Sequence, residues 1–161
     1  MKFTGTIPKG QPTLKPVSAF KNGHWEFPEQ MAGQGWVGFV YVIYDKELSR
    51  GYIGKKQYYG TGKLNNGKES NWRTYKTSSP LLKEHFAVRP LSEFEFICLE
   101  QYRTKGTLSY SETWSLCFVE APTTKLYYNT LIEKVSWRVS EPISARHRER
   151  LIQFMERVKG V

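Results

Sequence analysis

The 161-residue sequence contains few cysteines and histidines and no long apolar stretch. Its two cysteines, Cys98 and Cys117, each stand in a short apolar run, so we predict core thiols and no disulfide. Three scattered histidines do not give the cysteine and histidine spacing of a zinc site. No run approaches the roughly 18 apolar residues of a membrane span, and residues 1–10 lack the apolar core of a signal peptide. We therefore expect a cytoplasmic protein without a membrane partner.

Acidic residues are also scarce relative to basic ones. Asp and Glu together number 15 against 24 Lys and Arg, which gives a formal net charge of +9. This excess favours a polyanionic partner over an acidic small molecule. The basic residues are unevenly spread, because residues 55–83 contain seven of them and a single acid, Glu69. A chain of this length is expected to form one domain with a substantial core.

Apolar patterns predict an α+β fold with a central three-stranded antiparallel sheet flanked by helices. Two apolar runs, residues 38–44 and 94–101, and a shorter, more polar one, residues 51–57, are expected to form the strands. A four-residue loop over 45–48 would join the first two strands. This loop places Tyr41 directly opposite Tyr52, with Gly54 leaving the same face open beside them. Taken alone, the two tyrosines form an ordinary cross-strand pair that stabilises a hairpin.

The segments that flank this body have different compositions. Residues 1–35 contain four prolines and little periodicity, which indicates an extended arm pinned to the body by Trp25-Glu26-Phe27. The arm is expected to pack over the sheet edge, and contact with DNA is the alternative. Residues 36–135 would form the body, and 136–161 a C-terminal basic amphipathic helix packed on the same domain. Its arginine-rich face leaves a second DNA contact open.

Two helices are predicted within the body. Ser79 as the N-cap and Pro80 at the first position indicate the start of one helix. The other covers residues 110–120, with an apolar stripe that includes Cys117 and Phe118.

Glu112 lies on a second apolar stripe of this helix, together with Leu116 and Val119. A carboxylate on a covered face needs a partner, because an unpaired buried charge is costly. From the residues alone, the partner could be a core lysine or arginine, or a divalent metal ion.

Four features, in this order, resemble the signature of the GIY-YIG nucleases. Tyr41 is followed after eleven residues by Tyr52-Ile53-Gly54. Residues 71–79 are similar to the tryptophan, basic residue, tyrosine and double serine of a phage-type, SegE-like branch. Glu112 and Asn129 then follow as the family's glutamate and terminal asparagine do. The resemblance covers residues 38–130.

The resemblance implies a metal-dependent DNA endonuclease, either a phage homing-type enzyme or one that nicks or degrades DNA. It assigns Glu112 to one Mg²⁺ (or Mn²⁺) ion and makes Tyr41 the candidate general base. Tyr52 and Arg73 would orient water and phosphate, and Asn129 would support the catalytic residues. A non-catalytic nucleic-acid-binding protein on the same fold is the alternative, and the oligomeric state is left open.

The sequence departs from the common family pattern near Arg73. This residue lies nineteen positions beyond Gly54, and Thr77 stands where many members carry a histidine. Tyr75, Lys76 or a lysine after Gly54 could therefore take the role given to Arg73. The expected DNA-contacting residues are polar, aromatic or basic ones between the hairpin and the next helix: Lys55, Lys56, Lys63, Lys68, Tyr75, Lys76, Ser78 and Ser79. For the glycine- and lysine-rich part of this segment, a merely solvated loop is equally compatible with the sequence.

Overall fold

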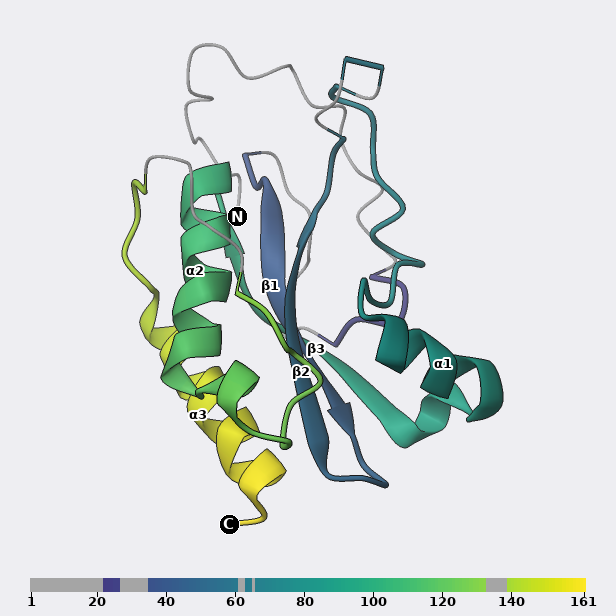
Figure 1. Ribbon diagram of the computed structural model, residues 1–161. Coiled ribbons are helices and arrows are strands. Elements are labelled where there is room, and N and C mark those ends of the chain that lie inside the picture. Colours follow the sequence, from purple (N-terminus) through teal and green to yellow (C-terminus); the bar gives the residue numbers. More distant parts are fainter. Residues whose placement is uncertain (1–21, 27–34, 61–62, 65, 133–138) are drawn as a thin grey trace.

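The computed structural model describes residues 22–26, 35–60, 63–64, 66–132 and 139–161 (Figure 1). Its elements, in chain order, are β1 (Gly38–Asp45), β2 (Arg50–Gln57), α1 (Pro80–Val88), η1 (Leu91–Glu93), β3 (Phe94–Tyr102), α2 (Lys105–Phe118), η2 (Ala121–Thr123) and α3 (Ala145–Lys159). The strands form one antiparallel sheet in the order β2-β1-β3. The α+β fold with a three-stranded sheet is therefore confirmed. None of the helices in the described ranges is long and apolar enough to cross a membrane.

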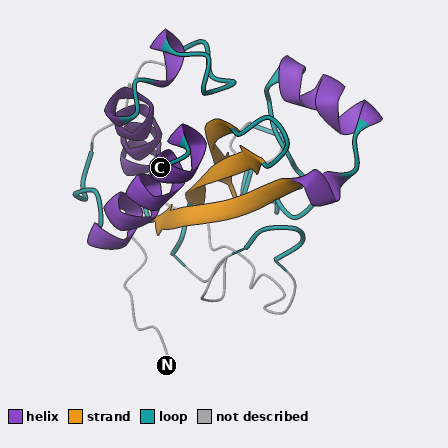
Figure 2. Cartoon of the chain, turned by 90° about the horizontal axis from the view of Figure 1, so that it is seen from below, coloured by secondary structure: helices purple, strands orange, loops and turns teal. Residues whose placement is uncertain are grey.

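Helices cover both faces of the sheet, α2 and α3 on one side and α1 on the other (Figures 1 and 2). Alternation along the central strand explains the two cores. Phe39 and Tyr41 of β1 belong to the core on the α1 side, and Val40 and Val42 belong to the core under α2 and α3. Because β1 is covered on both faces, it is apolar throughout, as the sequence predicts.

The loop that joins β1 to β2 lies one residue later than the sequence predicts, over 46–49 rather than 45–48. Tyr41 therefore pairs with Gly54 instead of Tyr52. The predicted direct pairing of the two tyrosines is wrong. They are diagonal neighbours on one face of the sheet.

Asp45 explains this shift, because it is buried at the end of β1 and does not belong to the loop. Its Oδ1 accepts hydrogen bonds from the backbone N–H groups of Glu47 and Leu48, each at 3.1 Å. Arg89 donates to both carboxylate oxygens at 2.7 and 2.8 Å, and the Tyr128 hydroxyl donates at 2.7 Å. Burial alone would raise the pKa of Asp45, but the hydrogen bonds from Arg89 and Tyr128 outweigh it and lower the pKa to about 2. The fixed carboxylate sets where the turn begins.

The described part of the N-terminal arm is pinned to the sheet, as predicted for Trp25 and Glu26. The backbone N–H of Glu26 donates to Phe96 at 2.7 Å, and its carbonyl accepts from Cys98 at 2.9 Å, so this residue adds to the edge of β3. Trp25 is buried, and its Nε1 donates to the Trp72 carbonyl at 2.8 Å. Phe27, most of the predicted arm and the predicted boundary at 135–136 lie outside the described residues.

α1 begins as predicted, with Ser79 as its N-cap and Pro80 at its first position. α2 begins at Lys105, earlier than the predicted start at 110, because Thr104 Oγ1 accepts a hydrogen bond from the Thr107 N–H. The added turn is rich in small and polar residues, and it carries no apolar stripe that the sequence pattern could detect.

Two predictions about the end of α2 are corrected. Cys117 and Phe118 are exposed, whereas Cys98 is buried as predicted. Phe118 stacks on Trp114 with ring centroids 5.0 Å apart, outside the main core. The inner face of α2 is instead lined by small residues, among them Ser111 and Ser115, whose hydroxyls donate to carbonyls of the preceding turn. Small side chains let the helix lie close to the sheet.

Candidate active site

Three tyrosine rings meet on the α1 side of the sheet. Tyr41 of β1 lies 6.1 Å from Tyr52 of β2, measured between ring centroids. Tyr75, from the segment before α1, approaches Tyr41 edge-on at 6.4 Å. Trp25 closes the cluster from the N-terminal side, with its ring centroid 4.6 Å from that of Tyr41. The two predicted tyrosines therefore share a site, and Tyr75 joins them.

Gly54 makes room for the Tyr41 hydroxyl. A Cβ atom at position 54 would lie 2.5 Å from the Tyr41 Oη, so any side chain there would displace the phenol. The open space that the sequence predicts beside Gly54 is filled by Tyr41 itself. The Tyr41 hydroxyl is fully buried and makes no well-formed hydrogen bond to the described residues, although the Tyr75 side chain is near enough to raise its pKa. An unpartnered buried hydroxyl is uncommon, and it indicates a position prepared for a ligand or an ordered water.

Burial dominates the electrostatics of the phenols. Burial raises the pKa of Tyr41 well above its ordinary value, and negative charge on Tyr52, Tyr75 or Glu112 would raise it further. Burial also raises the pKa of Tyr52, partly offset by a hydrogen bond to Ser78, and Glu112 again contributes in the raising direction. The carboxylate of Glu112 is thus near enough to act on both phenols.

The segment before α1 also contacts Tyr52. The Tyr52 hydroxyl and Ser78 Oγ are 3.0 Å apart. Ser79 Oγ accepts a hydrogen bond from the Leu82 N–H and so caps α1, and Thr77 Oγ1 accepts one from the Ser79 N–H at 3.0 Å. Of the two serines, Ser78 therefore faces the phenols and Ser79 fixes the helix start.

Glu112 reaches the site from α2, on the opposite side of the sheet from the tyrosine rings. Its carboxylate accepts a hydrogen bond from Lys55 Nζ at 2.6 Å, and both side chains are mostly buried, at 15% and 21% exposure. The prediction that Glu112 has a partner is correct, and in the protein alone this partner is a lysine. β2, which carries Lys55 and Tyr52, is an edge strand of the sheet.

Lys56, the next residue, points to the other face and supports Tyr75. Its Nζ lies 4.1 Å from the centroid of the Tyr75 ring and donates to Asn71 Oδ1 at 2.9 Å. Burial lowers the pKa of Lys56. A cation over an aromatic face is attracted by the ring quadrupole, so Lys56 fixes where Tyr75 lies.

Arg73 contacts residues of its own segment. Its guanidinium pairs with Glu69, one helical turn earlier, and lies over the Trp72 ring at 4.3 Å. Trp72 Nε1 donates to the same Glu69 carboxylate at 2.9 Å. These contacts hold Arg73 against Glu69 and Trp72, and its predicted role beside the two tyrosines stays a prediction. Lys56 is a basic residue that contacts the cluster.

Asn129 contacts β2 with its whole side-chain amide. Its Oδ1 accepts a hydrogen bond from the Ile53 N–H at 2.9 Å, and its Nδ2 donates to the Ile53 carbonyl at 2.8 Å. Two residues away, Gly51 pairs with the backbone of Leu126 and Tyr128. These contacts replace a neighbouring strand at the edge of β2 and fix the backbone between Tyr52 and Gly54.

The remaining predicted DNA-contacting lysines lie around the cluster and not in it. Lys63 and Lys68 are exposed in the loop that follows β2. Lys76 is partly buried and lies near His24, whose pKa is lowered first by burial and then by this lysine. Their contact with DNA stays a prediction.

The available ligands fit a single hard cation. No group of three or more His, Cys, Asp or Glu side chains occurs in the described ranges that could enclose a metal ion. Mg²⁺ is commonly bound through one or two carboxylates, with waters and substrate phosphates completing its shell. Glu112 is the carboxylate of the site that could serve as such a ligand, and a cation there would compete with Lys55.

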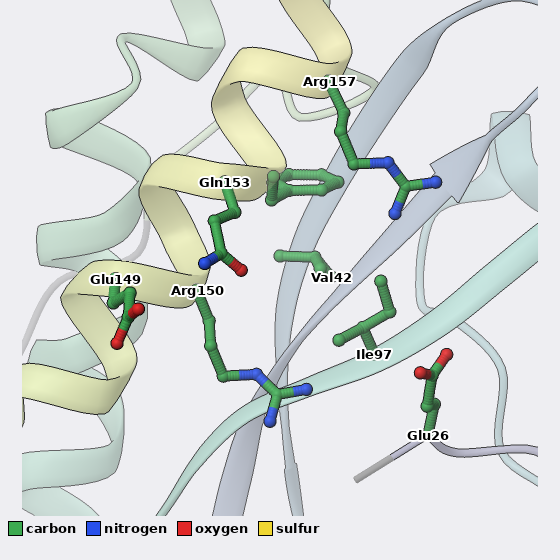
Figure 3. A pocket seen from close by; sticks show the side chains of 8 residues that line it. Glu26, Val42, Ile97, Glu149, Arg150, Gln153 and Arg157 are labelled. Carbon is green, nitrogen blue, oxygen red and sulfur yellow. The ribbon is translucent and has the colours of Figure 1, made fainter. Parts of the chain in front are cut away.

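A separate pocket of about 390 Å³ lies between α3 and β3, under the other face of the sheet (Figure 3). Arg150 and Arg157 project from α3 on either side of Val42 and Ile97. Glu26 and Glu149 also line it, so the two arginines face two acids. The pocket is lined by equal numbers of acidic and basic side chains, and it lies on the opposite face of the sheet from the phenols. We therefore treat it as separate from the candidate active site.

The sequence offered Tyr75 and the lysines after Gly54 as alternatives to Arg73, but it did not pair Lys55 with Glu112 or place Tyr75 against Tyr41. For Lys55 a signal exists, because neighbouring residues of a strand point to opposite faces. Lys55 therefore shares a face with Ile53, which is the face covered by the helix of Glu112. No comparable signal places Tyr75, since it lies in irregular backbone.

Comparison with known families agrees with this geometry. Residues 23–132 match the profile of the family described as "Putative endonuclease segE, GIY-YIG domain". No significant match was found among curated proteins or solved structures. The matched range runs from the segment that carries Trp25, through the tyrosine cluster and Glu112, to Asn129. The chain belongs to the SegE-type GIY-YIG family, whose domain is that of a nuclease.

Proposed function

We propose that the protein is a metal-dependent endonuclease that hydrolyses DNA phosphodiester bonds. The observation that carries this proposal is the buried, unpartnered Tyr41 hydroxyl, placed among two further phenols and within electrostatic range of Glu112. Hydrolysis of a phosphodiester needs an oriented water, positive charge near the phosphate and support for the leaving oxygen. The cluster offers hydroxyl groups, lysines and one carboxylate for these tasks.

Glu112 is the residue that would hold a Mg²⁺ or Mn²⁺ ion. Such an ion, when bound, supplies positive charge against the phosphate and makes a bound water more acidic. Glu112 is well supported for this role, because α2 fixes its backbone and a mostly buried position limits competing water. Asn129 would act indirectly as a positioning residue, since its amide fixes the strand that carries Tyr52.

Tyr41 remains the candidate general base. Burial keeps its phenol protonated in the protein alone, because its pKa lies well above the ordinary value. A positive charge beside the hydroxyl would favour the phenolate. Tyr41 therefore orients the attacking water as a hydrogen-bonding group, and it accepts a proton only when cations have assembled at the site.

Tyr52 and Tyr75 would position the phosphate. The Tyr52 hydroxyl is restrained by Ser78, and the Tyr75 ring is restrained by Lys56. Lys56 supplies the positive charge that the family resemblance assigns to Arg73. Arg73 itself is engaged with Glu69 and would support the segment from outside the cluster.

The substrate is DNA in this proposal, contacted by the basic segment after β2. Lys63, Lys68 and Lys76 carry charges suited to phosphate contacts, which provide affinity without sequence preference. Homing-type cleavage and general nicking or degradation of DNA both fit this arrangement. A nucleic-acid-binding protein without activity is the rival function. It accounts for Glu112 as the mostly buried partner of Lys55, but it gives no use to the unpartnered Tyr41 hydroxyl.

Supercoiled plasmid tests the proposal directly. We expect wild-type protein with Mg²⁺ or Mn²⁺ to nick or linearise the plasmid, and EDTA to stop the reaction. Glu112→Gln keeps the side-chain shape and removes the charge, so its rate should fall by at least about 100-fold. Gel electrophoresis over a time course measures the conversion and separates single-strand from double-strand cleavage.

A matched control is Glu156→Gln, which removes an exposed carboxylate from α3 and should leave the rate unchanged. Fluorescence anisotropy with a labelled duplex gives binding for each variant. If wild-type protein bound DNA but cut none with either metal ion, the rival binding function would replace the nuclease. Equal rates for wild type and Glu112→Gln would remove Glu112 from the chemistry.

A further inference from the structure

Two adjacent lysines of β2 point to opposite faces of the sheet. Lys55 reaches Glu112 of α2 at 2.6 Å, whereas Lys56 reaches Asn71 and the Tyr75 ring on the other face. The two residues are alike in chemistry and one position apart, so the fold alone gives them different tasks. Of these two lysines, Lys55 is the one that contacts the carboxylate that the proposed function assigns to a metal ion.

The Lys55–Glu112 pair has the form of a carboxylate with a cation already bound. The ammonium group is a compact point charge, and it lies against Oε2 in a mostly buried position. A buried carboxylate without such a partner would be costly. An ion bound at the same carboxylate would lie next to the ammonium group. Two adjacent positive charges repel each other strongly where water is largely excluded.

We infer that Lys55 occupies the cation position on Glu112 in the metal-free protein, so that a divalent ion binds only by displacing the lysine ammonium. This inference rests on the proposed function, because it takes Glu112 as the metal ligand. Lys55 then acts as a resident counterion that keeps the carboxylate charged and in place until a divalent ion arrives. Once displaced, its ammonium group lies at the rim of β2, where it can contact a DNA phosphate.

The exchange has a direct consequence for affinity. The free energy of binding of a divalent ion must exceed that of the lost Lys55–Glu112 contact, so the lysine weakens metal binding. A partly exposed ion pair contributes up to about 1 kcal/mol, which corresponds to roughly fivefold in a binding constant. Divalent ions can overcome this competition through their higher charge, and monovalent ions compete poorly.

Titration of the DNA-free protein with Mn²⁺ tests the inference without measuring cleavage. Isothermal calorimetry at neutral pH should give Lys55→Met a dissociation constant on the order of fivefold lower than that of wild type. Lys56→Met is the matched control, since it removes the same charge one residue away. Its constant should change by less than about twofold, because it does not contact Glu112.

Thermal denaturation with and without Mn²⁺ provides a second readout. Lys55→Met should be less stable than wild type without metal, because Glu112 loses its partner, and Mn²⁺ should raise its melting temperature more than it raises that of wild type. Should Lys55→Met fold poorly, Lys55→Gln gives the same comparison with a polar side chain. An unchanged or weaker Mn²⁺ affinity in these variants would overturn the inference.

Wild-type protein alone gives a third test. Nuclear magnetic resonance of lysine side chains detects ammonium groups that are protected by a stable ion pair. The protected Lys55 signal should disappear as Mg²⁺ saturates the site, and its persistence at saturation would contradict displacement. If neither wild type nor any variant bound a divalent ion, the metal-dependent function itself would fail. Metal binding with no difference between Lys55→Met and Lys56→Met would refute only the displacement.

Discussion

Two buried polar clusters lie on opposite faces of the sheet, and they differ in how well their polar atoms are paired. Under α2 and α3, His147 lies between Tyr102 and Ser115, with its Nδ1 2.8 Å from the Tyr102 hydroxyl and its Nε2 2.6 Å from Ser115 Oγ. On the α1 side, the Tyr41 hydroxyl lies beside Tyr52 and has no partner among the described residues. One cluster is complete in the protein alone, and the other is not.

The complete cluster can be assigned proton by proton. Ser115 Oγ donates to the Ser111 carbonyl at 2.6 Å, so it accepts the hydrogen of His147 Nε2. The bare Nδ1 of His147 then accepts from the Tyr102 hydroxyl, whose pKa is raised to about 12 mainly by burial. Every donor finds an acceptor, and none of the three groups is exposed. This arrangement connects α3 to α2 and β3, and it is suited to stability rather than chemistry.

The incomplete cluster has the opposite property. An unpaired buried hydroxyl makes the fold less stable than an apolar group of the same shape would, so it indicates a position that a ligand or an ordered water can use. The difference between the two clusters therefore separates residues that hold the fold from candidates for contact with a substrate. Substitutions in the tyrosine cluster should lower the cleavage rate and leave stability nearly unchanged. Substitutions in the His147 cluster should lower stability and leave the cleavage rate of the folded protein unchanged.

Tyr41→Phe should give the largest separation of the two effects. Removing the hydroxyl deletes a group that has no partner, so we expect the free energy of unfolding to change by less than about 1 kcal/mol. Plasmid cleavage should fall by about 100-fold or more, since a group that transfers or positions a proton contributes on that scale. Urea denaturation and the plasmid assay measure the two quantities on the same preparation.

Tyr102→Phe is the control on the other face. It deletes a hydroxyl that donates to His147, so it should lower stability and leave the cleavage rate of the folded protein unchanged. A Tyr41→Phe protein that cut DNA at the wild-type rate would remove this hydroxyl from the mechanism. A loss of stability comparable to that of Tyr102→Phe would show that its partner had been overlooked.

The pH dependence of stability should report the complete cluster. Burial, aided by Arg148, lowers the pKa of His147 to about 4 from the ordinary 6.5. Between these values the unfolded chain binds a proton that the folded protein does not, so stability is fully present above pH 6.5 and falls as pH approaches 4. The full shift corresponds to about 3 kcal/mol.

Urea midpoints measured at pH 7 and at pH 4.5 check this slope. His147→Gln can still donate to Ser115 and accept from Tyr102, and it cannot titrate, so most of the slope should vanish. An equal slope in both proteins would assign the loss to other groups. Asp45 is a poor candidate, because its pKa is lowered to about 2 and its stabilising contribution is lost only below about pH 3.8.

The sequence predicted the elements of the fold better than it predicted their register. Alternation along β1 and the cap at Ser79 are local signals, and the structure follows both. The hairpin register depended on whether Asp45 belongs to the strand or to the loop. That choice is made by Arg89 and Tyr128, which lie far along the chain, and no local pattern records it.

The candidate site shows the same division. Tyr41 and Tyr52 share a face because strand alternation requires it, and Glu112 needed a partner because its helix face is covered. Arg73 pairs with Glu69, four residues earlier, a contact that the sequence analysis did not anticipate. A four-residue spacing of opposite charges indicates an ion pair only where the backbone turns back on itself, and the sequence does not show this turn.

Substitution of one serine in each cluster, Ser115 and Ser78, compares the two clusters further, and these substitutions should have the smallest effects. Ser115 and Ser78 each bond to a ring group, Ser115 in the buried complete cluster and Ser78 at the exposed rim of the tyrosines. Ser115→Ala leaves the Nε2 hydrogen of His147 without an acceptor and should cost about 1 to 3 kcal/mol of stability. Ser78→Ala should cost less than about 1 kcal/mol, because water can replace its contact with Tyr52. It should instead slow plasmid cleavage several-fold by releasing the Tyr52 hydroxyl, and equal stability losses in the two variants would contradict the division between the faces.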